Sequence, residues 1–258
     1  MADALTHSAT MVGRSVRLSS RNPDAVITAL ALPVLLMLVF VYLFGGAIDT
    51  GGGYGRYVDY VAPGVLVLCA GFGAGFGAGT TAMSVADDMK GAVIDRFRSL
   101  DVGGTAVLAG HVAASVVRNL AATVLVFGVA FAVGFRPEAG VGGWLASAGL
   151  LLAVITAISW VAAAVGLLAD SPEAAGGFTF FLAFLPYPSS AFVPVDSMPG
   201  WLHGFAEHQP LTPVIESLRG LLLGHPVGGS PWEALAWCAG LTAVSVAAAA
   251  ALFRRRTS

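Results

Sequence analysis

The chain has 258 residues, of which 57% are hydrophobic and only 11% are charged, and its formal net charge is −2. Because about one quarter of the residues of an ordinary soluble domain are charged, this composition excludes a soluble protein and indicates a membrane protein. So small a net charge says little about partners, and we expect no nucleic acid among them.

Six apolar stretches are long enough to cross a bilayer, whose hydrocarbon core needs about 20 apolar residues per helix. The expected spans are 25–45, 60–82, 106–134, 142–169, 174–194 and 233–253. The third span joins two charge-free windows around Arg118. We therefore predict an all-α integral membrane protein with six transmembrane helices. An even number of spans places both termini on the same side.

The positive charges indicate which side this is, because short loops rich in Lys and Arg stay in the cytoplasm. The face opposite the termini has only Arg56, Arg136 and Arg219. The face of the termini has nine such residues: Arg14, Arg17, Arg21, Lys90, Arg96, Arg98, Arg254, Arg255 and Arg256. Both termini are therefore expected in the cytoplasm. The first span is too long and begins too late for a cleavable signal, so we expect the whole chain to be retained.

Residues 1–24, ahead of the first span, contain a periodic segment. From Leu5 to Arg21, the apolar side chains fall within about 60° of one another on a helical wheel, with three arginines roughly opposite. This pattern predicts an amphipathic helix in the cytoplasmic interface, or a positively charged flank that only fixes the orientation. At the other end of the chain, residues 254–258 form a cytoplasmic tail.

Span 2 contains the sequence AGFGAGFGAGT at 70–80, with a glycine at every second position. It is not a phosphate-binding loop, because the motif G-x-x-x-x-G-K-[ST] is missing. On a helix, Gly71, Gly75 and Gly79 form a row of small residues that allows a neighbouring helix to approach closely. We interpret this row as a packing surface.

Residues 87–102 hold seven charged side chains in sixteen positions, whereas the other 242 residues hold twenty-one. Within this stretch, Val93, Phe97 and Leu100 recur at a helical spacing, and charged residues fall away from that row. We therefore predict a short amphipathic helix at 88–100, between spans 2 and 3. Its apolar row needs a partner surface, either another cytoplasmic protein or the membrane.

Arg118 lies in the inner third of span 3, and a charge at the bilayer centre costs about 2.5–3.5 kcal/mol. We favour a side chain that snorkels to the interface or is hydrogen-bonded within the protein over one that binds substrate. Cys69 and Cys238 lie inside spans and are interpreted as small apolar residues. No cluster of His, Asp, Glu and Cys has metal-ligand spacing, so we expect no metal.

Four prolines interrupt the end of span 5 and the residues that follow it: Pro186, Pro188, Pro194 and Pro199. A regular, lipid-exposed helix is therefore not expected there. Residues 195–231 are predicted to form an outer re-entrant hairpin of two short helices. We expect Thr212 to cap the second of these helices, and Glu216 to pair with Arg219.

Three stretches make the sequence resemble a known family. The segment KGAVIDRFRSLDV at 90–102 is similar to the cytoplasmic coupling segment of ABC-2 type exporter permeases of the daunorubicin-resistance kind. The stretch FVPVDSMPGWLHGFAEHQPLTPVIESLRGLLLG at 192–224 resembles the outer segment of the same family. The arginine-containing segment that ends in Asn22-Pro23 is similar too. Asp101 departs from the family pattern, because relatives usually have proline there.

The resemblance implies the transmembrane subunit of an ATP-driven exporter of the type V kind, with an ABC-2 domain at 25–253. Two permeases, either identical copies or sister chains, would form the path, and two cytoplasmic ATPase subunits would dock on the coupling helices. The chain has no ATP-binding motif. We therefore expect that it is not an enzyme and binds no cofactor, with ATP and magnesium on the partner, and that it lies in a bacterial plasma membrane.

The resemblance also implies three groups of functional residues. The ATPase-coupling group is Lys90, Gly91, Asp95, Arg96, Phe97, Arg98, Ser99 and Leu100. The substrate path, between spans 2 and 5, is lined by Phe72, Phe76, Phe180, Phe181 and Phe184. The outer gate is formed by Phe192, Met198 and Trp201. Packing or contact with lipid is the alternative interpretation of each aromatic residue.

The expected function is export of a hydrophobic or amphiphilic compound, such as a drug, an antibiotic or a lipid-like molecule. One alternative is a lipid- or polysaccharide-exporting permease of the same family. An ion-coupled secondary transporter is disfavoured because no Asp or Glu lies in the middle of a span. An intramembrane protease is disfavoured because no histidine lies deep in a span to activate a serine such as Ser159.

Overall fold

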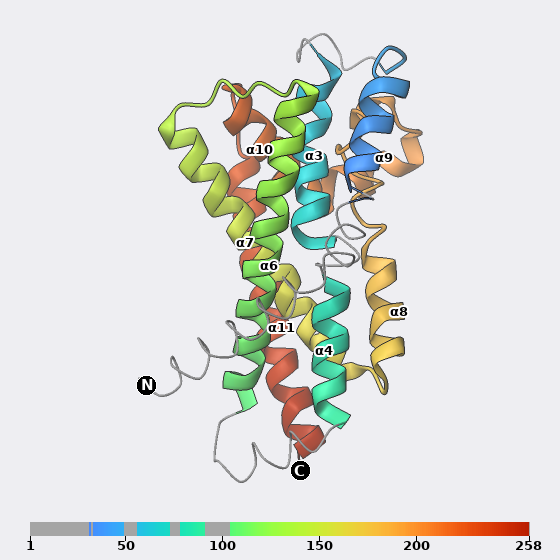
Figure 1. Ribbon diagram of the computed structural model, residues 1–258, viewed down its shortest axis with the longest axis vertical. Coiled ribbons are helices and arrows are strands. Elements are labelled where there is room, and N and C mark those ends of the chain that lie inside the picture. The colour runs from blue at the N-terminus through green and yellow to red at the C-terminus, as the bar shows by residue number, and fades with distance from the viewer. Residues whose placement is uncertain (1–30, 32, 49–55, 73–77, 91–103, 258) are drawn as a thin grey trace.

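A computed structural model describes residues 31, 33–48, 56–72, 78–90 and 104–257 (Figure 1). The predicted N-terminal helix at 1–24 and most of the predicted coupling helix at 88–100 lie outside these residues. Every regular element in the described part of the chain is a helix, which confirms the all-α fold class there.

Among the described residues, the chain starts with the short apolar helix Pro33–Phe44, which ends in a π-helical turn, η1 (Val39–Phe44). The later helices are α3 (Tyr57–Phe72), α4 (Ala78–Lys90), α6 (Gly104–Val133), α7 (Val141–Leu168), α8 (Pro172–Leu182), the 3-10 turn η2 (Val195–Ser197), α9 (Gly200–His208), α10 (Leu211–Leu223) and α11 (Ser230–Thr257). Residues 88–90 of the predicted coupling helix therefore belong to the end of α4.

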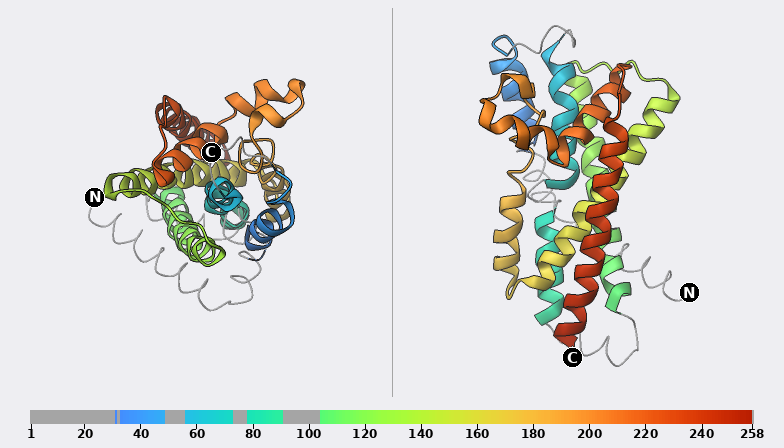
Figure 2. Two further views of the ribbon diagram at one scale, coloured as in Figure 1. Left: turned by 90° about the horizontal axis from the view of Figure 1, so that it is seen from above. Right: turned by 180° about the vertical axis from the view of Figure 1, so that it is seen from behind.

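Three of the described helices are long and apolar enough to cross a membrane: Val107–Val133 in α6, Val141–Leu168 in α7 and Ser230–Arg255 in α11. They coincide closely with the third, fourth and sixth predicted spans. The central helix is α7, which packs against α3, α4, α6, α10 and α11. The long helices run along the molecule, and α11 carries the C-terminus to the end opposite α9 and α10 (Figures 1 and 2). Following the predicted orientation, we call the end with the C-terminus the inner end and the other the outer end.

The predicted span 60–82 corresponds to two helices, α3 and α4, that follow one another along the bundle (Figure 1). Gly71, near the end of α3, packs so closely on α7 that a Cβ atom there would overlap the side chain of Ile158. Gly166 of α7 lies equally close to the backbone of Ala82 in α4. The predicted packing role is therefore confirmed for Gly71. Residues 73–77 lie outside the described part of the chain, so the role of Gly75 stays a prediction.

Helix α8 ends at Leu182, well before the predicted end of its span at 194, and turns occupy 183–192. The helix begins with Ser171, whose hydroxyl accepts a hydrogen bond from the Ala174 amide at 3.1 Å, followed by a proline in the first turn. Prolines farther on lack the N–H that a continued helix would use. The predicted irregularity of the outer part of span 5 is confirmed.

Buried apolar side chains form a large cluster along the bundle and a smaller one at its inner end. We call the smaller one the inner cluster, and it consists of Val85, Leu108, Val112, Ala163, Leu167 and Ala249. These residues come from α4, α6, α7 and α11. The inner cluster therefore holds together the inner ends of four helices.

Candidate functional site

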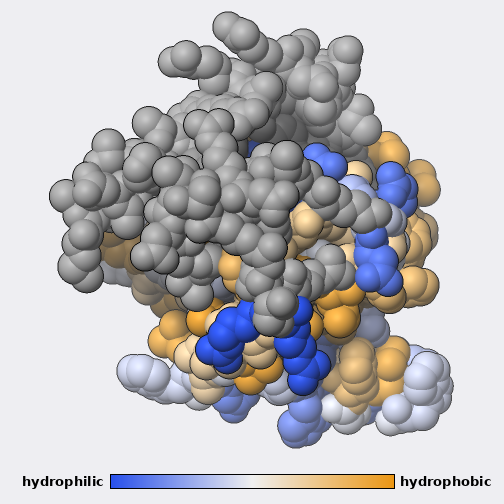
Figure 3. Space-filling model, turned by 90° about the horizontal axis from the view of Figure 1, so that it is seen from below, coloured by the Kyte–Doolittle hydropathy of each residue, from blue (hydrophilic) through white to orange (hydrophobic). Residues whose placement is uncertain are grey.

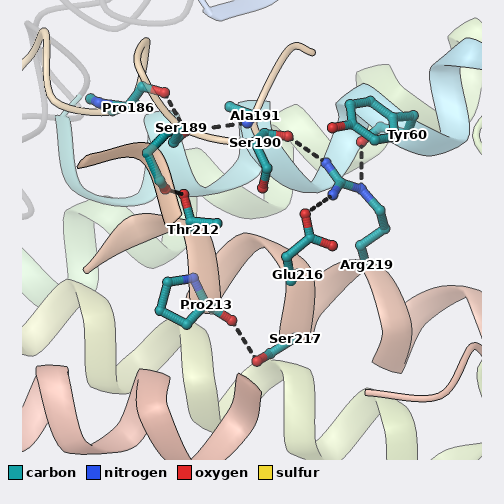
Figure 4. A network of polar contacts seen from close by, with 11 residues as sticks. Tyr60, Pro186, Ser189, Ser190, Ala191, Thr212, Pro213, Glu216, Ser217 and Arg219 are labelled. Atoms are coloured by element: carbon teal, nitrogen blue, oxygen red, sulfur yellow. Dashed lines mark hydrogen bonds and ion pairs between the residues drawn. The ribbon is translucent and has the colours of Figure 1, made fainter. Parts of the chain in front are cut away.

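A buried arginine organises the outer end of the bundle. The side chain of Arg219, on α10, is 0% exposed. Its Nε donates a hydrogen bond to the Tyr60 carbonyl oxygen (3.1 Å), its Nη2 to the Ser190 carbonyl oxygen (2.7 Å), and its Nη1 lies 2.6 Å from Oε1 of Glu216 (Figure 4). The guanidinium carbon also lies 3.7 Å from the centre of the Tyr60 ring. The predicted pairing of Glu216 with Arg219 is confirmed.

The Arg219 network joins three parts of the chain that are far apart in sequence. These are α10, the first turn of α3 and the turns at 183–192. A buried charge is strongly unfavourable unless it is paired and hydrogen-bonded, and here carbonyl oxygens and a carboxylate satisfy the guanidinium. The stacking of the guanidinium on an aromatic ring adds a cation–π attraction. The network therefore fixes the position of the outer hairpin relative to α3.

Further contacts fasten the turns at 183–192 to the same helices. The Tyr57 hydroxyl donates to the Phe192 carbonyl oxygen (2.6 Å), and Nε2 of Gln209 donates to the Pro188 carbonyl oxygen (3.0 Å). Gly64 of α3 faces Ala191, and a Cβ atom at residue 64 would lie only 2.6 Å from the Ala191 Cα and carbonyl oxygen. Residues 189–192 of this irregular stretch are therefore buried in protein, as expected for backbone without regular helical hydrogen bonds, whereas Phe184 and Tyr187 are exposed.

The close approach at Gly64 leads to a prediction. A Gly64→Ala variant should unfold more easily than the native protein, by about 1–3 kcal/mol, because the new methyl group overlaps backbone atoms that cannot move aside locally. The matched control is Gly128→Ala on α6, where a Cβ atom meets nothing within 4 Å. Thermal unfolding in detergent measures both. Equal midpoints for the two variants would contradict the tight contact between α3 and Ala191.

Thr212 is not the cap of the second outer helix, as the sequence had indicated. Helix α10 begins at Leu211, one residue before Thr212, and Pro210 occupies the capping position. The Thr212 hydroxyl instead donates to the Ala206 carbonyl oxygen, at the end of α9. Carbonyl groups in the last turn of a helix lack an intrahelical partner, so this contact satisfies α9 rather than α10.

The three predicted outer-gate residues lie in different environments. Phe192 is buried, and its ring stacks on those of Phe40 (4.3 Å between centroids) and Tyr187 (5.6 Å). Met198 is half-buried, and its carbonyl oxygen lies 2.7 Å from Nε2 of His203. Trp201 is 82% exposed on α9. The side chain of Phe192 is thus part of the packed core, whereas that of Trp201 is available for contact outside this chain.

Three of the predicted substrate-path residues lie on α8 and in the turn after it. Phe180, Phe181 and Phe184 are all exposed, and the ring of Phe180 makes edge contacts with the other two, with centroids 6.2 and 5.1 Å apart. Phe178, which was not among the predicted path residues, is exposed as well. We call these four residues the α8 aromatic face. Phe72 is the last residue of α3. Its side chain and the whole of Phe76 lie outside the described part of the chain.

Arg118 forms a hydrogen bond within the protein. Its Nη2 donates to the hydroxyl oxygen of Thr81 on α4 at 3.2 Å, which agrees with one of the two favoured interpretations. Beside it, the Ser159 hydroxyl of α7 donates to the hydroxyl of Ser115 (2.9 Å), and Nδ2 of Asn119 donates to the same oxygen (3.2 Å). The first two of these hydrogen bonds link α6 to α4 and to α7. Such polar contacts help helices to associate in a membrane, because the hydrophobic effect does not drive association there.

Of the predicted ATPase-coupling residues, the structure places only Lys90, as the last residue of α4. Gly91, Asp95, Arg96, Phe97, Arg98, Ser99 and Leu100 lie outside the described residues. Seen from the inner end, the described surface combines hydrophilic and hydrophobic residues (Figure 3). No three His, Cys, Asp or Glu side chains gather as metal ligands within the described ranges.

An all-helical bundle with three membrane-crossing helices and several shorter apolar ones defines a multi-pass membrane protein. Residues 6–223 match the ABC-2 type transporter family, so the chain belongs to that family. It is therefore a non-catalytic permease subunit of an ABC transporter, which works with a partner ATPase subunit. Permeases of this kind typically bind no cofactor.

Two similar proteins are permeases associated with drug resistance. The chain is 29% identical to the daunorubicin resistance ABC transporter permease protein DrrB1 of Streptomyces coeruleorubidus, over 100% of this chain and 89% of that protein. It is 25% identical to the probable doxorubicin resistance ABC transporter permease protein DrrC of Mycobacterium tuberculosis, over 93% of this chain and 85% of that protein. The resemblance found in the sequence is confirmed, and it extends along nearly the whole length of these relatives.

Proposed function

We propose that this permease exports a hydrophobic or amphiphilic compound across a bacterial plasma membrane, driven by ATP hydrolysis on two cytoplasmic ATPase subunits. The observation that carries the proposal is the full-length similarity to a daunorubicin resistance permease. The α8 aromatic face adds to it, because four exposed phenylalanine rings offer flat apolar surfaces to a planar or amphiphilic molecule.

In this proposal the chain crosses the membrane six times, with both termini in the cytoplasm. The three long helices account for spans 3, 4 and 6, and the shorter apolar helices together with the turns at 183–192 complete spans 1, 2 and 5. Two permease chains, as identical copies or sister chains, enclose the substrate path between spans 2 and 5. The α8 aromatic face then meets the second chain or the substrate rather than lipid alone.

Energy enters through residues 87–102, the most charged stretch of the chain. The ATPase docks on the apolar row that contains Phe97 and Leu100, and Lys90, Asp95, Arg96 and Arg98 make the surrounding polar contacts. Closure of the ATPases on ATP displaces this segment and, with it, the inner end of the bundle. A secondary transporter is not favoured, because α6 and α7 have no Asp or Glu within their membrane-crossing parts to hold a coupling ion.

The proposal is tested by co-expressing the permease with candidate ABC ATPase subunits from the same organism. The ATPase should co-purify with the permease, and daunorubicin, taken from the name of the similar permease, is the first substrate probe. Daunorubicin should raise ATP hydrolysis by the purified pair. A pair that responds to a lipid-linked sugar but not to daunorubicin or other amphiphilic drugs would favour the lipid- or polysaccharide-exporting alternative instead.

A further inference from the structure

A hydrogen bond between a histidine and a carboxylate joins the two helices on either side of residues 91–103, most of which belong to the charged stretch 87–102, called the charged segment below. Nε2 of His111, in the second turn of α6, is 2.8 Å from Oδ2 of Asp88, in the last turn of α4. At this distance the imidazole N–H donates a hydrogen bond to the carboxylate. Residues 91–103 connect the two helices, so the pair joins the helix that leads into the segment to the helix that leads out of it. We call the two side chains the inner clasp.

The position of Asp88 explains why it needs a partner. A carboxylate in the last turn of a helix faces the negative end of the helix dipole, which disfavours it there. A donor on a neighbouring helix compensates for this repulsion. His111 supplies that donor, and the contact is partly buried, with 19% of the His111 side chain and 36% of the Asp88 side chain exposed.

The inner clasp lies beside the inner cluster. Val85 is three residues before Asp88 on α4, and Leu108 is three residues before His111 on α6, so each clasp residue shares a helix face with a member of the cluster. The cluster also includes residues of α7 and α11. The apolar contacts hold four helix ends together, while the clasp fixes the two ends that border the charged segment.

We infer that Asp88 and His111 are positioning residues that make α4 and α6 move together when the charged segment is displaced. The inference rests on the proposed function, in which the ATPase pushes on that segment. With the clasp closed, a displacement reaches α6 and, through the inner cluster, α7 and α11. Without the clasp, part of the displacement is lost in separating α4 from α6. The inner end therefore moves as one block instead of span 2 moving alone.

The test uses Asp88→Ala, His111→Ala and the exchange variant Asp88→His with His111→Asp. The control is Asp196→Ala, which removes an exposed carboxylate at the outer end, far from residues 87–102. The first readout is the distance distribution between spin labels at Ser84→Cys and Ala109→Cys, two exposed positions, in the permease alone and without the native cysteines. The second is the amount of daunorubicin transported per ATP hydrolysed in proteoliposomes that contain the permease and its ATPase.

Each single variant should broaden the distance distribution and lower transport per ATP by about fivefold or more, the scale of a typical coupling between sites. The exchange variant should restore both readouts, and the control should change neither. Unchanged distances and unchanged transport per ATP in Asp88→Ala and His111→Ala would overturn the inference. If the ATPase fails to bind even the native permease, the proposed function is wrong, and the distance measurement alone then decides: a broadened distribution supports the clasp and an unchanged one refutes it.

Discussion

Replacement of Arg219 by alanine is expected to lower the free energy of unfolding by about 3–5 kcal/mol, the usual cost of removing one partner from a buried ion pair. The variant loses the hydrogen bonds to the Tyr60 and Ser190 carbonyl oxygens as well as the contact with Glu216. It also leaves a cavity between α10, α3 and the turns at 183–192. Because stabilities of about 5–15 kcal/mol are typical, this loss is a large share of the total. Denaturant titration in mixed micelles measures it.

Arg136 offers the matched control for this variant. Its Nη1 also donates to two carbonyl oxygens, those of Phe131 and Phe135, at 2.8 and 2.9 Å, but its side chain is exposed. Arg136→Ala should therefore be much less destabilising. Arg219→Lys should fall between the two, because an ammonium group keeps the charge but lacks the planar fork that reaches several acceptors. Equal unfolding midpoints for Arg219→Ala and Arg136→Ala would show that the network does not stabilise the outer end.

The second large effect is expected at the charged segment. Combined replacement of Phe97 and Arg98 by alanine should weaken ATPase binding by about thirtyfold or more. It should also abolish daunorubicin-stimulated ATP hydrolysis. Aromatic and arginine side chains are the usual anchors of protein interfaces, and loss of one such anchor costs about 2 kcal/mol or more. Binding of the purified ATPase to the permease in nanodiscs measures the first effect, and phosphate release the second.

The control for the coupling variant removes the same residue types at the outer end. Phe205 is exposed on α9, and Arg56, ahead of α3, is exposed and paired with Asp59 at 3.3 Å. Phe205→Ala with Arg56→Ala should leave ATPase binding unchanged. If the Phe97 and Arg98 variant still binds the ATPase normally and keeps substrate-stimulated hydrolysis, the coupling segment has been assigned to the wrong residues.

The long helices were predictable because their sequence signal is continuous. The predicted spans at 106–134, 142–169 and 233–253 begin and end within four residues of the ends of α6, α7 and α11, since uninterrupted apolar runs bounded by polar residues leave little choice in a membrane. The irregular end of span 5 was also predictable, because proline carries a specific backbone constraint. The described residues of the predicted span 60–82 belong to α3 and α4. The glycine row predicted close helix packing, and Gly71 shows it against α7.

The partners of Arg219 were not predictable, because two of them are backbone carbonyl groups, which every residue has. Tyr60 and Ser190 lie 159 and 29 residues away from the arginine. One signal was available: Arg219 follows Leu218 and sits one helical turn from Ile215 and Leu222, so it falls beside the apolar stripe of α10. A charge in that position indicates burial with partners. The contact in the inner clasp was not predictable either. The sequence places Asp88 and His111 near consecutive helices but does not show which faces of those helices meet.

The two ends of the bundle are held by different means, and this difference bears on the proposed mechanism. At the outer end, a buried charge and its acceptors fix α10 and the turns at 183–192 to α3. At the inner end, an apolar cluster joins α4 to α6, α7 and α11, and the partly exposed hydrogen bond between Asp88 and His111 joins α4 to α6. Both helices of span 2 contribute to the large apolar cluster, but only α4 also contributes to the inner cluster. We expect a push on the inner end to reach α4 before it reaches α3.

The central claim, that ATP hydrolysis on a separate subunit drives export through this permease, is tested most directly by transport into proteoliposomes. Vesicles that contain the permease and its ATPase, with the nucleotide sites facing outward, should accumulate daunorubicin or another amphiphilic compound only when ATP and magnesium are supplied. Accumulation should stop when the ATPase is omitted or when its ATP hydrolysis is blocked. Uptake driven by a proton or sodium gradient, with the permease alone and no ATPase present, would contradict the claim.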